Sequence, residues 1–261
     1  MEKIPDILKK IVETKKEEVK DLQKFSTFHQ NEIKNIKSPL NFKNALRLKP
    51  GYRSVIAEVK KASPSAGIIS SDFNPVSIAK EYEIGDADAI SVLTDKQYFK
   101  GDVNFLKEIK KNVNIPILRK DFIIDEVQIF ETRAIGADSF LLIAAILSSS
   151  QLLDYIAMGR ELGMEPLVEV HDEYELEKTL ECGANIIGIN NRNLRNFTVD
   201  IHTTVRLIPY ISADKIAVGE SGITSIEIAH KLYDAGATSL LIGEFLMRSN
   251  NKKQVIQQLK K

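Results

Sequence analysis

Short apolar runs recur along this chain, and each one leads into polar or glycine residues. The first is Val55-Ile56-Ala57-Glu58-Val59-Lys60, where the period-two alternation of a β-strand places Glu58 and Lys60 on one face. Charged side chains on an interior face are costly unless water or partners stabilise them, so this strand predicts a polar pocket at its carboxyl end. A half-exposed edge strand with both charges in water is the other interpretation. The turn at 63–67, Ser-Pro-Ser-Ala-Gly, is expected to line the pocket rim.

The later runs repeat this pattern. Strands are predicted at residues 54–60, 88–93, 115–119, 138–144, 166–170, 185–190, 215–219 and 238–242. Helical patterns lie between them, including those at 74–84, 125–135, 149–162 and 225–235. The last of these helices has Ser225 or Thr224 as its expected N-cap. Because lysine, glutamate, asparagine or glycine follows the strands, the polar groups are expected at one end of a common sheet.

A weak internal repeat supports a regular alternation of strands and helices. Four glycines recur roughly every 50 residues: Gly85, Gly136, Gly183 and Gly236. Each ends an amphipathic segment as a C-cap glycine would. Together, the four glycines would stand before every second strand of a longer alternation. Eight βα units predict a single (β/α)8 TIM barrel, whose active site lies at the carboxyl ends of its strands. A doubly wound open sheet is the competing fold, but its glycine-rich first turn is missing.

Residues 1–52 precede the first strand and are predicted to form an N-terminal helical extension of one barrel domain that spans residues 1–261. Helical spacing of apolar residues is seen at Ile4, Ile7, Leu8, Ile11, Val12, Val19 and Leu22. This helix is expected to pack on the barrel, and its lysines are expected to form a solvated face. A second, short helix is expected after Ser38-Pro39. Whether the first 35 residues cover the pocket is left open.

Composition excludes several classes of function. The 36 basic and 36 acidic residues balance, so no polyanion-binding surface is indicated and no nucleic-acid partner is expected. No apolar stretch is long enough to predict a membrane partner, and the single cysteine, Cys182, fits a reducing cytoplasm and a small buried residue. A soluble, cytoplasmic protein is therefore expected. A monomer is the expected state, although the sequence does not give the oligomeric state. The histidines lack metal-ligand spacing, so no metal is expected and all four are interpreted as structural or surface residues: His29, His171, His202 and His230.

Two glycine-containing strand ends predict a phosphate site. Ser221-Gly222 follows the seventh strand and Gly243-Glu244 follows the eighth, where barrels bind phosphate through backbone N–H groups. Simple turns are the alternative explanation of both glycines. A phosphorylated small molecule is therefore the expected partner.

Two lysines and a glutamate are the candidates for chemistry. Lys60 and Lys120 would point into the cavity opposite Glu169. Crowding and burial are expected to lower the pKa of a lysine and to raise the pKa of a glutamate, which suits general acid and base catalysis without metal. A Schiff-base lysine is a second possibility, and a structural ion-pair network is a third.

Seven segments, in order, resemble the indole-3-glycerol-phosphate synthase family. They are IAEVKKASPS at 56–65, LTD at 93–95 with Gly101, KDF at 120–122, EPLVEVH at 165–171, GINNRNL at 188–194, GESGI at 219–223 and IGEFLMR at 242–248. The resemblance covers about residues 38–248 and implies a barrel enzyme of tryptophan biosynthesis. Such an enzyme closes the ring of 1-(2-carboxyphenylamino)-1-deoxyribulose 5-phosphate, with loss of carbon dioxide and water, to give indole-3-glycerol phosphate. The resemblance implies no cofactor.

The resemblance also implies roles for individual residues. Lys120 would be the general acid and Glu169 the general base. The catalytic network would be completed by Glu58, Lys60 and Asn190. The implied substrate-binding residues are Ser63 and Arg192 for anionic or polar ends, Ser221, Gly222 and Gly243 for the phosphate, Phe99, Phe122, Leu141 and Ile143 for the aromatic ring, and Glu220 beside them. For the four apolar residues, packing in the core is the competing interpretation.

The chain departs from some members of that family. Ala62 stands where a further lysine can occur, and Glu244-Phe245 stands where small hydroxylated residues can occur. These departures put side-chain contacts at those positions in doubt but leave the backbone phosphate site intact.

Three other functions compete with this one. Phosphoribosylanthranilate isomerase would pair an aspartate with a cysteine, yet Cys182 lies in a predicted helix. A Schiff-base aldolase would use Lys60 or Lys120. A non-catalytic sensor of phosphorylated metabolites could lack both Lys120 and Glu169, which are present here. Association with other enzymes of tryptophan biosynthesis is left open.

Overall fold

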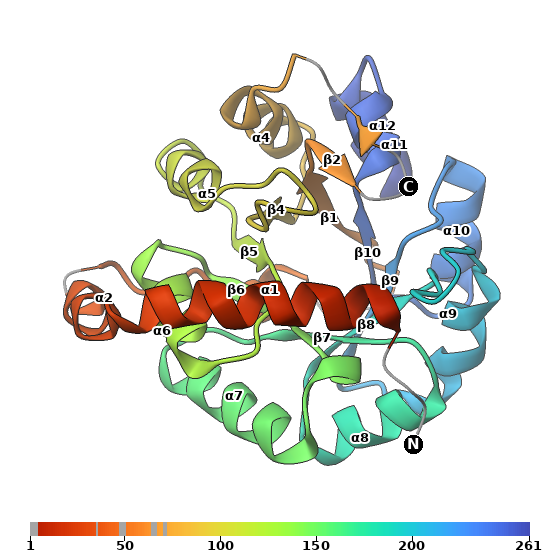
Figure 1. The fold of residues 1–261 in the computed structure, drawn as a ribbon. Helices are drawn as coiled ribbons and strands as arrows, with labels where there is room; N and C mark the ends of the chain where they lie inside the picture. Colours follow the sequence, from red (N-terminus) through yellow and green to blue (C-terminus); the bar gives the residue numbers. More distant parts are fainter. Residues whose placement is uncertain (1–4, 35, 47–50, 64–66, 70–71) are drawn as a thin grey trace.

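Eight parallel strands close into a barrel in the order β1-β10-β9-β8-β7-β6-β5-β4 (Figure 1). The computed structural model describes residues 5–34, 36–46, 51–63, 67–69 and 72–261, with the backbone alone at Phe28. The barrel strands are β1 (Ser54–Val59), β4 (Ala89–Leu93), β5 (Ile117–Lys120), β6 (Ser139–Ile143), β7 (Leu167–Val170), β8 (Ile186–Asn190), β9 (Ile216–Glu220) and β10 (Ser239–Ile242). Each corresponds to a predicted strand, so the TIM-barrel fold with an N-terminal helical extension is confirmed.

Helices follow the strands and form the outer layer of the barrel (Figure 1). They are α4 (Pro75–Ile84), α5 (Val103–Lys110), α6 (Glu126–Ala134), α7 (Ser149–Glu161), α8 (Glu173–Glu181), α9 (His202–Leu207), α10 (Ile226–Asp234), α11 (Glu244–Arg248) and α12 (Lys252–Leu259), with short 3-10 turns η1 (Ala144–Ile146) and η2 (Ile208–Tyr210). Ser225 caps α10, because its side chain accepts a hydrogen bond from the backbone N–H of Ile228. No described helix combines the length and apolar character that a membrane crossing requires.

Three of the four repeated glycines end helices in the predicted way. Gly136, Gly183 and Gly236 have φ angles of 89°, 75° and 108°, a left-handed conformation in which glycine lacks the steric penalty of other residues. Gly85 differs, because its φ is −75° and the left-handed residue is Asp86. The prediction was therefore wrong by one residue at this turn, where a short polar side chain tolerates the left-handed region.

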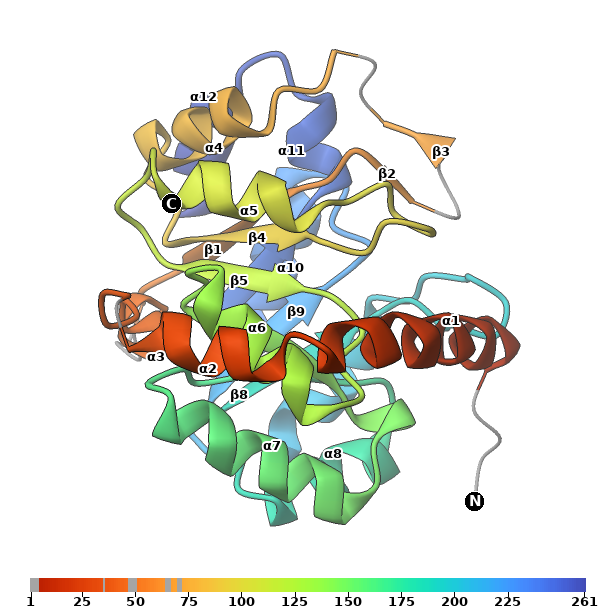
Figure 2. The same ribbon diagram turned by 60° about the vertical axis from the view of Figure 1, so that its left-hand side comes forward.

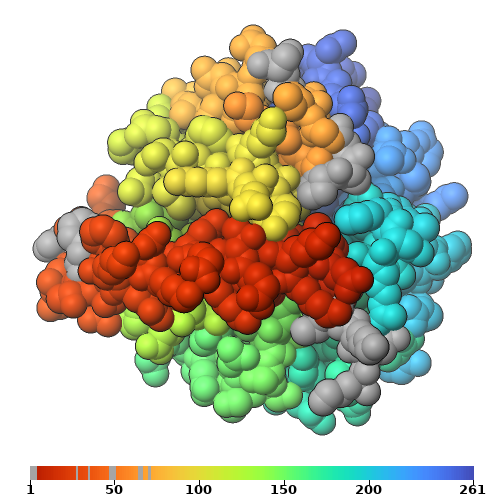
Figure 3. Space-filling model, in the orientation of Figure 1, coloured from red at the N-terminus to blue at the C-terminus, as the bar shows by residue number. Residues whose placement is uncertain are grey.

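The N-terminal extension consists of α1 (Asp6–Gln23), α2 (Ser26–Ile33) and α3 (Phe42–Ala45). Figures 1 and 3 show α1 lying across one end of the barrel. Leu8, Ile11 and Val19 are buried on its inner side, as the spacing predicted, whereas Ile4 lies outside the described residues. The short helix α3 begins after Asn41, which caps it, but α2 was not anticipated.

The lysines of α1 do not all form a solvated face. Lys9, Lys16 and Lys20 are exposed, as predicted, and so is Lys24, which follows the helix. Lys15 is 1% exposed and contradicts the prediction. Spacing alone did not reveal it because a buried lysine needs acidic partners from distant parts of the chain.

Side chains from alternate positions of the strands fill the barrel interior. Its apolar cluster includes Ile56 of β1, Leu118 of β5 and Leu167 of β7, and Phe42 of α3 packs against them. A pair of antiparallel strands, β2 (Ala62–Ser63) and β3 (Gly67–Ile68), extends beyond β1 (Figure 2). This pair was not predicted.

Candidate active site

A cavity of about 460 Å³ opens at the carboxyl ends of the barrel strands. The structure brings to it every residue that the sequence singled out, namely Glu58, Lys60, Ser63, Phe99, Lys120, Phe122, Leu141, Ile143, Glu169, Asn190, Arg192, Glu220, Ser221, Gly222 and Gly243. Parallel strands of a closed barrel end on the same face, so residues as far apart in sequence as Glu58 and Gly243 converge there. Ile7, Leu8 and Ile11 also line the cavity, so α1 covers part of it.

Lys120 forms the centre of the charged group. It lies at the end of β5, with its Nζ 3.4 Å from Oε2 of Glu169 on β7. The same ammonium contacts Oε2 of Glu220 on β9 more closely. All three side chains are shielded from solvent, which strengthens the attraction between them.

A second ion pair lies on β1. Nζ of Lys60 is 2.7 Å from Oε1 of Glu58, so the two residues share a face as the alternation predicted. Because β1 pairs with both β10 and β4, the interpretation of this segment as an edge strand was wrong. Across the barrel, Nδ2 of Asn190 donates a hydrogen bond of 3.0 Å to Oε1 of Glu169.

The pKa values in this group reverse the expected pattern. Burial alone would lower the pKa of Lys120, but the negative charges of Glu220, Glu169 and Glu58 hold it above its usual value. Burial alone would raise the pKa of Glu169, but the Lys120 ammonium holds it well below its usual range. The carboxyl group with a raised pKa is that of Glu220. Burial raises its pKa, the Lys120 ammonium opposes this, the negative charge of Glu169 adds to it, and the resulting pKa is about 7. The predicted shifts were wrong because one lysine faces several glutamates.

Gly188 on β8 leaves the space that Glu220 occupies. A methyl group at this position would overlap Oε1 of Glu220 and lie 2.8 Å from Cδ2 of Leu167. The sequence analysis did not single out this residue. A lone glycine in a strand of branched apolar residues is the signal that could have revealed it.

His171, directly after β7, lies behind Glu169. Its Nε2 is 3.3 Å from Oε1 of Glu169, and its Nδ1 is 2.9 Å from Oε2 of Glu175 on α8. Burial alone would lower the pKa of His171, but its close contacts with the carboxylates of Glu169 and Glu175 raise it to about 10. The imidazolium therefore stays charged at neutral pH. Interpreting this histidine as merely structural missed its contact with Glu169.

An aromatic pair forms one wall of the cavity. Phe99 follows β4 and Phe122 follows β5, and their ring centroids lie 6.0 Å apart. Leu141 and Ile143 of β6 line the same cavity and also belong to the apolar cluster inside the barrel. Packing in the core is therefore confirmed for these two residues, whereas their contact with an aromatic ring stays a prediction.

The turn after β9 has an unusual backbone. Ser221 and Gly222 both adopt left-handed conformations, with φ angles of 62° and 76°. Asn191 holds this turn, because its Nδ2 donates a 3.1 Å hydrogen bond to the carbonyl of Ser221 while its Oδ1 accepts from Thr204. A left-handed serine costs about 1–2 kcal/mol, which the surrounding structure must offset.

Gly243 separates β10 from α11 beside the ion pair of β1. A methyl group here would lie 2.9 Å from Nζ of Lys60 and would overlap the carboxylate of Glu58. Glu244, where the sequence departs from some family members, accepts a 2.8 Å hydrogen bond from Nε of Arg248. Its charge is thus paired with a cation on its own helix.

The rim contains both predicted and unpredicted residues. Arg192 donates a 3.3 Å hydrogen bond from Nη1 to the carbonyl of Phe197. Pro64, Ser65 and Ala66 of the predicted rim turn lie outside the described residues. Further lining residues that the sequence analysis missed are Leu194, Phe197, Val199, Thr224 and Arg248. The first four lie in irregular segments, where periodicity gives no signal, and Arg248 is the last residue of the short helix α11.

Comparison with known proteins identifies the family. A profile described as indole-3-glycerol phosphate synthase matches residues 8–259. The chain belongs to this family. Indole-3-glycerol phosphate synthase of Variovorax paradoxus (strain S110) is 46% identical over 264 residues, which cover 98% of the chain and 99% of the relative. The protein of the same name from Acetivibrio thermocellus is 51% identical over 225 residues, 86% of each.

Membership of the indole-3-glycerol phosphate synthase family confirms the resemblance seen in the sequence and makes the chain a carbon–carbon lyase. Among solved structures, 3-hexulose-6-phosphate synthase has a TM-score of 0.63 at 11% identity, covering 79% of this chain and 98% of that one. Thiamine phosphate pyrophosphorylase from Pyrococcus furiosus has a TM-score of 0.59 at 13% identity, covering 82% and 96%. At such identities the likeness concerns the fold alone.

Proposed function

We propose that this chain converts 1-(2-carboxyphenylamino)-1-deoxyribulose 5-phosphate into indole-3-glycerol phosphate, the ring closure of tryptophan biosynthesis. The main support is the buried group of Lys120, Glu169 and Glu220 at the strand ends of a family member. The aromatic pair of the apolar wall follows β4 and β5, whereas the glycine turns follow β9 and β10, and all of them line the same cavity. This arrangement suits a substrate that has an aromatic ring at one end and a phosphate at the other.

Lys120 is the general acid. The step that joins the aryl carbon to the substrate ketone requires a proton on the ketone oxygen, and an ammonium can supply it. Because the surrounding carboxylates raise the pKa of Lys120, it holds that proton at neutral pH. Protonation of Glu220, whose pKa is about 7, removes its closest counter-charge and makes Lys120 a stronger acid.

Glu169 is the general base. Ring closure leaves a proton to be removed after carbon dioxide departs, and a carboxylate with a lowered pKa is ionised when that proton must be accepted. Asn190 and His171 hold its Oε1, which leaves Oε2 on the side of Lys120. Acid and base therefore lie next to each other, as successive proton transfers at neighbouring substrate atoms require.

Two other parts of the cavity bind the ends of the substrate. The apolar wall that includes Phe99 and Phe122 accepts the aromatic ring and favours loss of the carboxylate in a dry environment. The backbone at Ser221, Gly222 and Gly243 binds the phosphate, because left-handed turns and glycines bring N–H groups close to an anion. Lys60 has one of two roles: it contacts an anionic group of the substrate, or it is the second acid that protonates the hydroxyl as this group leaves as water.

The rival functions agree less well with the geometry. A Schiff-base mechanism requires a neutral lysine, whereas the charges around Lys120 favour its protonated form. The isomerase chemistry requires a cysteine in the cavity, whereas Cys182 ends α8 and its thiol contacts the carbonyl of Ser149. The geometry also agrees with a non-catalytic sensor of phosphorylated metabolites, and a measured synthase activity would exclude it.

Indole emission after addition of the substrate tests the proposal directly, since the chain contains no tryptophan to obscure it. We expect the wild-type protein to produce indole-3-glycerol phosphate without added metal or cofactor. Lys120→Ala and Glu169→Gln should each lower turnover about a hundred- to ten-thousandfold while largely sparing substrate binding.

Lys111→Ala is the matched control, because Lys111 is an exposed lysine that pairs with Glu108 on the helix before β5. Near-normal turnover in either variant would remove the role assigned to that residue. Saturable binding without any indole from the wild-type protein would favour the sensor.

A further inference from the structure

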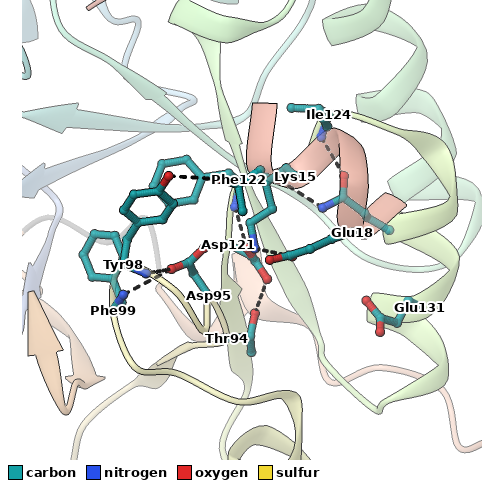
Figure 4. A network of polar contacts seen from close by, with 12 residues as sticks. Lys15, Glu18, Thr94, Asp95, Tyr98, Phe99, Asp121, Phe122, Ile124 and Glu131 are labelled. Carbon is teal, nitrogen blue, oxygen red and sulfur yellow. Dashed lines mark hydrogen bonds and ion pairs between the residues drawn. The ribbon is translucent and has the colours of Figure 1, made fainter. Parts of the chain in front are cut away.

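The buried lysine of α1 lies outside the catalytic group but next to the aromatic wall. Lys15 is 1% exposed, and all three of its N–H donors face carboxylates. Its Nζ is 3.0 Å from Asp95, 2.9 Å from Asp121 and 2.8 Å from Glu18. Figure 4 shows these side chains gathered between α1 and the segments that follow β4 and β5.

Both aspartates also accept hydrogen bonds from backbone N–H groups in or beside the cavity wall. Oδ1 of Asp95 accepts hydrogen bonds from the backbone N–H groups of Tyr98 and Phe99, at 2.7 and 3.1 Å. Oδ1 of Asp121 accepts a 2.8 Å hydrogen bond from the backbone N–H of Phe122. Each of the two aspartates that Lys15 holds therefore fixes the backbone of one member of the aromatic pair.

The two aspartates depend on Lys15 to different degrees. Asp121 has other partners, with its Oδ2 accepting from Thr94 at 2.6 Å and from Arg119 at 3.1 Å. Among the described residues, Lys15 is the one cation within ion-pair distance of Asp95. Loss of Lys15 would thus leave a buried carboxylate without a counter-charge, at the start of the segment that carries Phe99.

Other contacts join α1 to the same segment. Oγ1 of Thr14 lies 3.0 Å from the hydroxyl of Tyr98, which also donates to the carbonyl of Lys10 at 3.3 Å. The segment between β4 and α5 is therefore attached to the helix at two points, Asp95 and Tyr98, both shortly before Phe99.

We infer that Lys15 is a positioning residue for substrate binding: by holding Asp95 and Asp121 together, it sets the spacing of Phe99 and Phe122 for the aryl group. This inference rests on the proposed function, in which those rings bind the aromatic end of the substrate. Lys15 touches no reacting atom, so it acts on affinity more than on the chemical step. It also gives α1 a function beyond covering the cavity.

The test measures two quantities in the wild type and in each variant: the KM of the substrate and the inhibition constant of inorganic phosphate. We expect Lys15→Met to raise KM by about tenfold with a much smaller change in kcat, because misplaced binding groups weaken binding of the aryl end. The inhibition constant of inorganic phosphate should stay unchanged, since the phosphate turns lie elsewhere in the cavity. A double-mutant cycle with Phe99→Ala should show that the two effects on KM are not additive.

Two further variants make the result specific. Lys15→Arg keeps the charge and should recover most of the affinity. Lys16→Met removes an exposed neighbour that pairs with Glu13, and it should leave KM unchanged. If Lys15→Met does not fold, Asp95→Asn replaces it, because asparagine keeps the acceptor for the Phe99 N–H and loses only the charge that attracts Lys15.

Three outcomes would overturn the inference: an unchanged KM in a folded Lys15→Met or Asp95→Asn protein, an equal loss of phosphate affinity, or additive effects with Phe99→Ala. Failure of the proposed function is distinguishable, because the wild-type protein would then make no indole. In that case anthranilate, followed by its own fluorescence, serves as the aryl probe, and equal binding by wild type and Lys15→Met overturns the inference.

Discussion

Single residues show how position changes the chemistry of a side chain. Lys15 and Lys120 are both buried lysines, yet burial does not make either one neutral, because each faces several carboxylates. Glu169 and Glu220 lie on the same cavity, yet their pKa values move in opposite directions. In both comparisons the number and sign of neighbouring charges outweigh burial.

Gly222→Val tests the phosphate site at the scale of one residue. Gly222 has a φ of 76°, and a Cβ there would lie 2.5 Å from Cγ1 of Val199. Backbone strain of about 1–2 kcal/mol would distort the turn and should raise KM roughly tenfold. Gly183→Val is the control, because Gly183 has a φ of 75° with nothing within 4 Å of the added carbon, and it should lower stability without changing KM. An unchanged KM in Gly222→Val would place the phosphate elsewhere.

At the scale of elements, the irregular segments after the strands carry the site and are fixed by side chains. Gln128 on α6 is the clearest example, since its Oε1 accepts from the backbone of Ile124 and Asp125 while its Nε2 donates to the carbonyl of Phe122. One buried amide thus joins the start of α6 to the cavity wall. Asp95 has the same function after β4.

Gln128→Met should lower the free energy of unfolding by about 2–3 kcal/mol, because buried backbone groups lose their partners. Urea unfolding measures this loss. Gln151 closes the equivalent capping box on α7 near the surface, so Gln151→Met should cost about 1 kcal/mol or less. Equal losses in the two variants would contradict the special role of burial at Gln128.

At the scale of the whole molecule, the barrel stability is tied to the charge state of its centre. The buried polar residues at the strand ends include Glu58, Glu169 and Glu220, and His171 extends the group toward α8. A folded state that binds protons differently from the unfolded chain has a stability that depends on pH.

His171 makes the sign of that dependence definite. Its pKa is raised from 6.5 to about 10, so the folded chain binds this proton more tightly than the unfolded chain. The resulting stabilisation is complete below pH 6.5 and is lost as the pH rises through about 10. Urea unfolding should therefore show a steeper fall in stability across this range for the wild type than for His171→Asn. His202→Asn, at an exposed histidine, should follow the wild type, and equal slopes for His171→Asn would contradict the assignment.

The sequence by itself determined the barrel, the order of its strands and the residues at their carboxyl ends. Strand alternation and helical spacing are local properties, and a closed parallel barrel places every strand end on one face. Lys120, Glu169 and Asn190 could therefore be assigned to one cavity before their distances were known.

Tertiary structure alone decided how those residues interact. The distances from Lys120 to two glutamates, the space that Gly188 leaves for Glu220 and the burial of Lys15 depend on contacts between elements far apart in sequence. Electrostatic energies change steeply with distance and solvent access, which no local pattern contains. For this reason the sequence predicted which residues meet, whereas the folded chain determined which of them carry the protons.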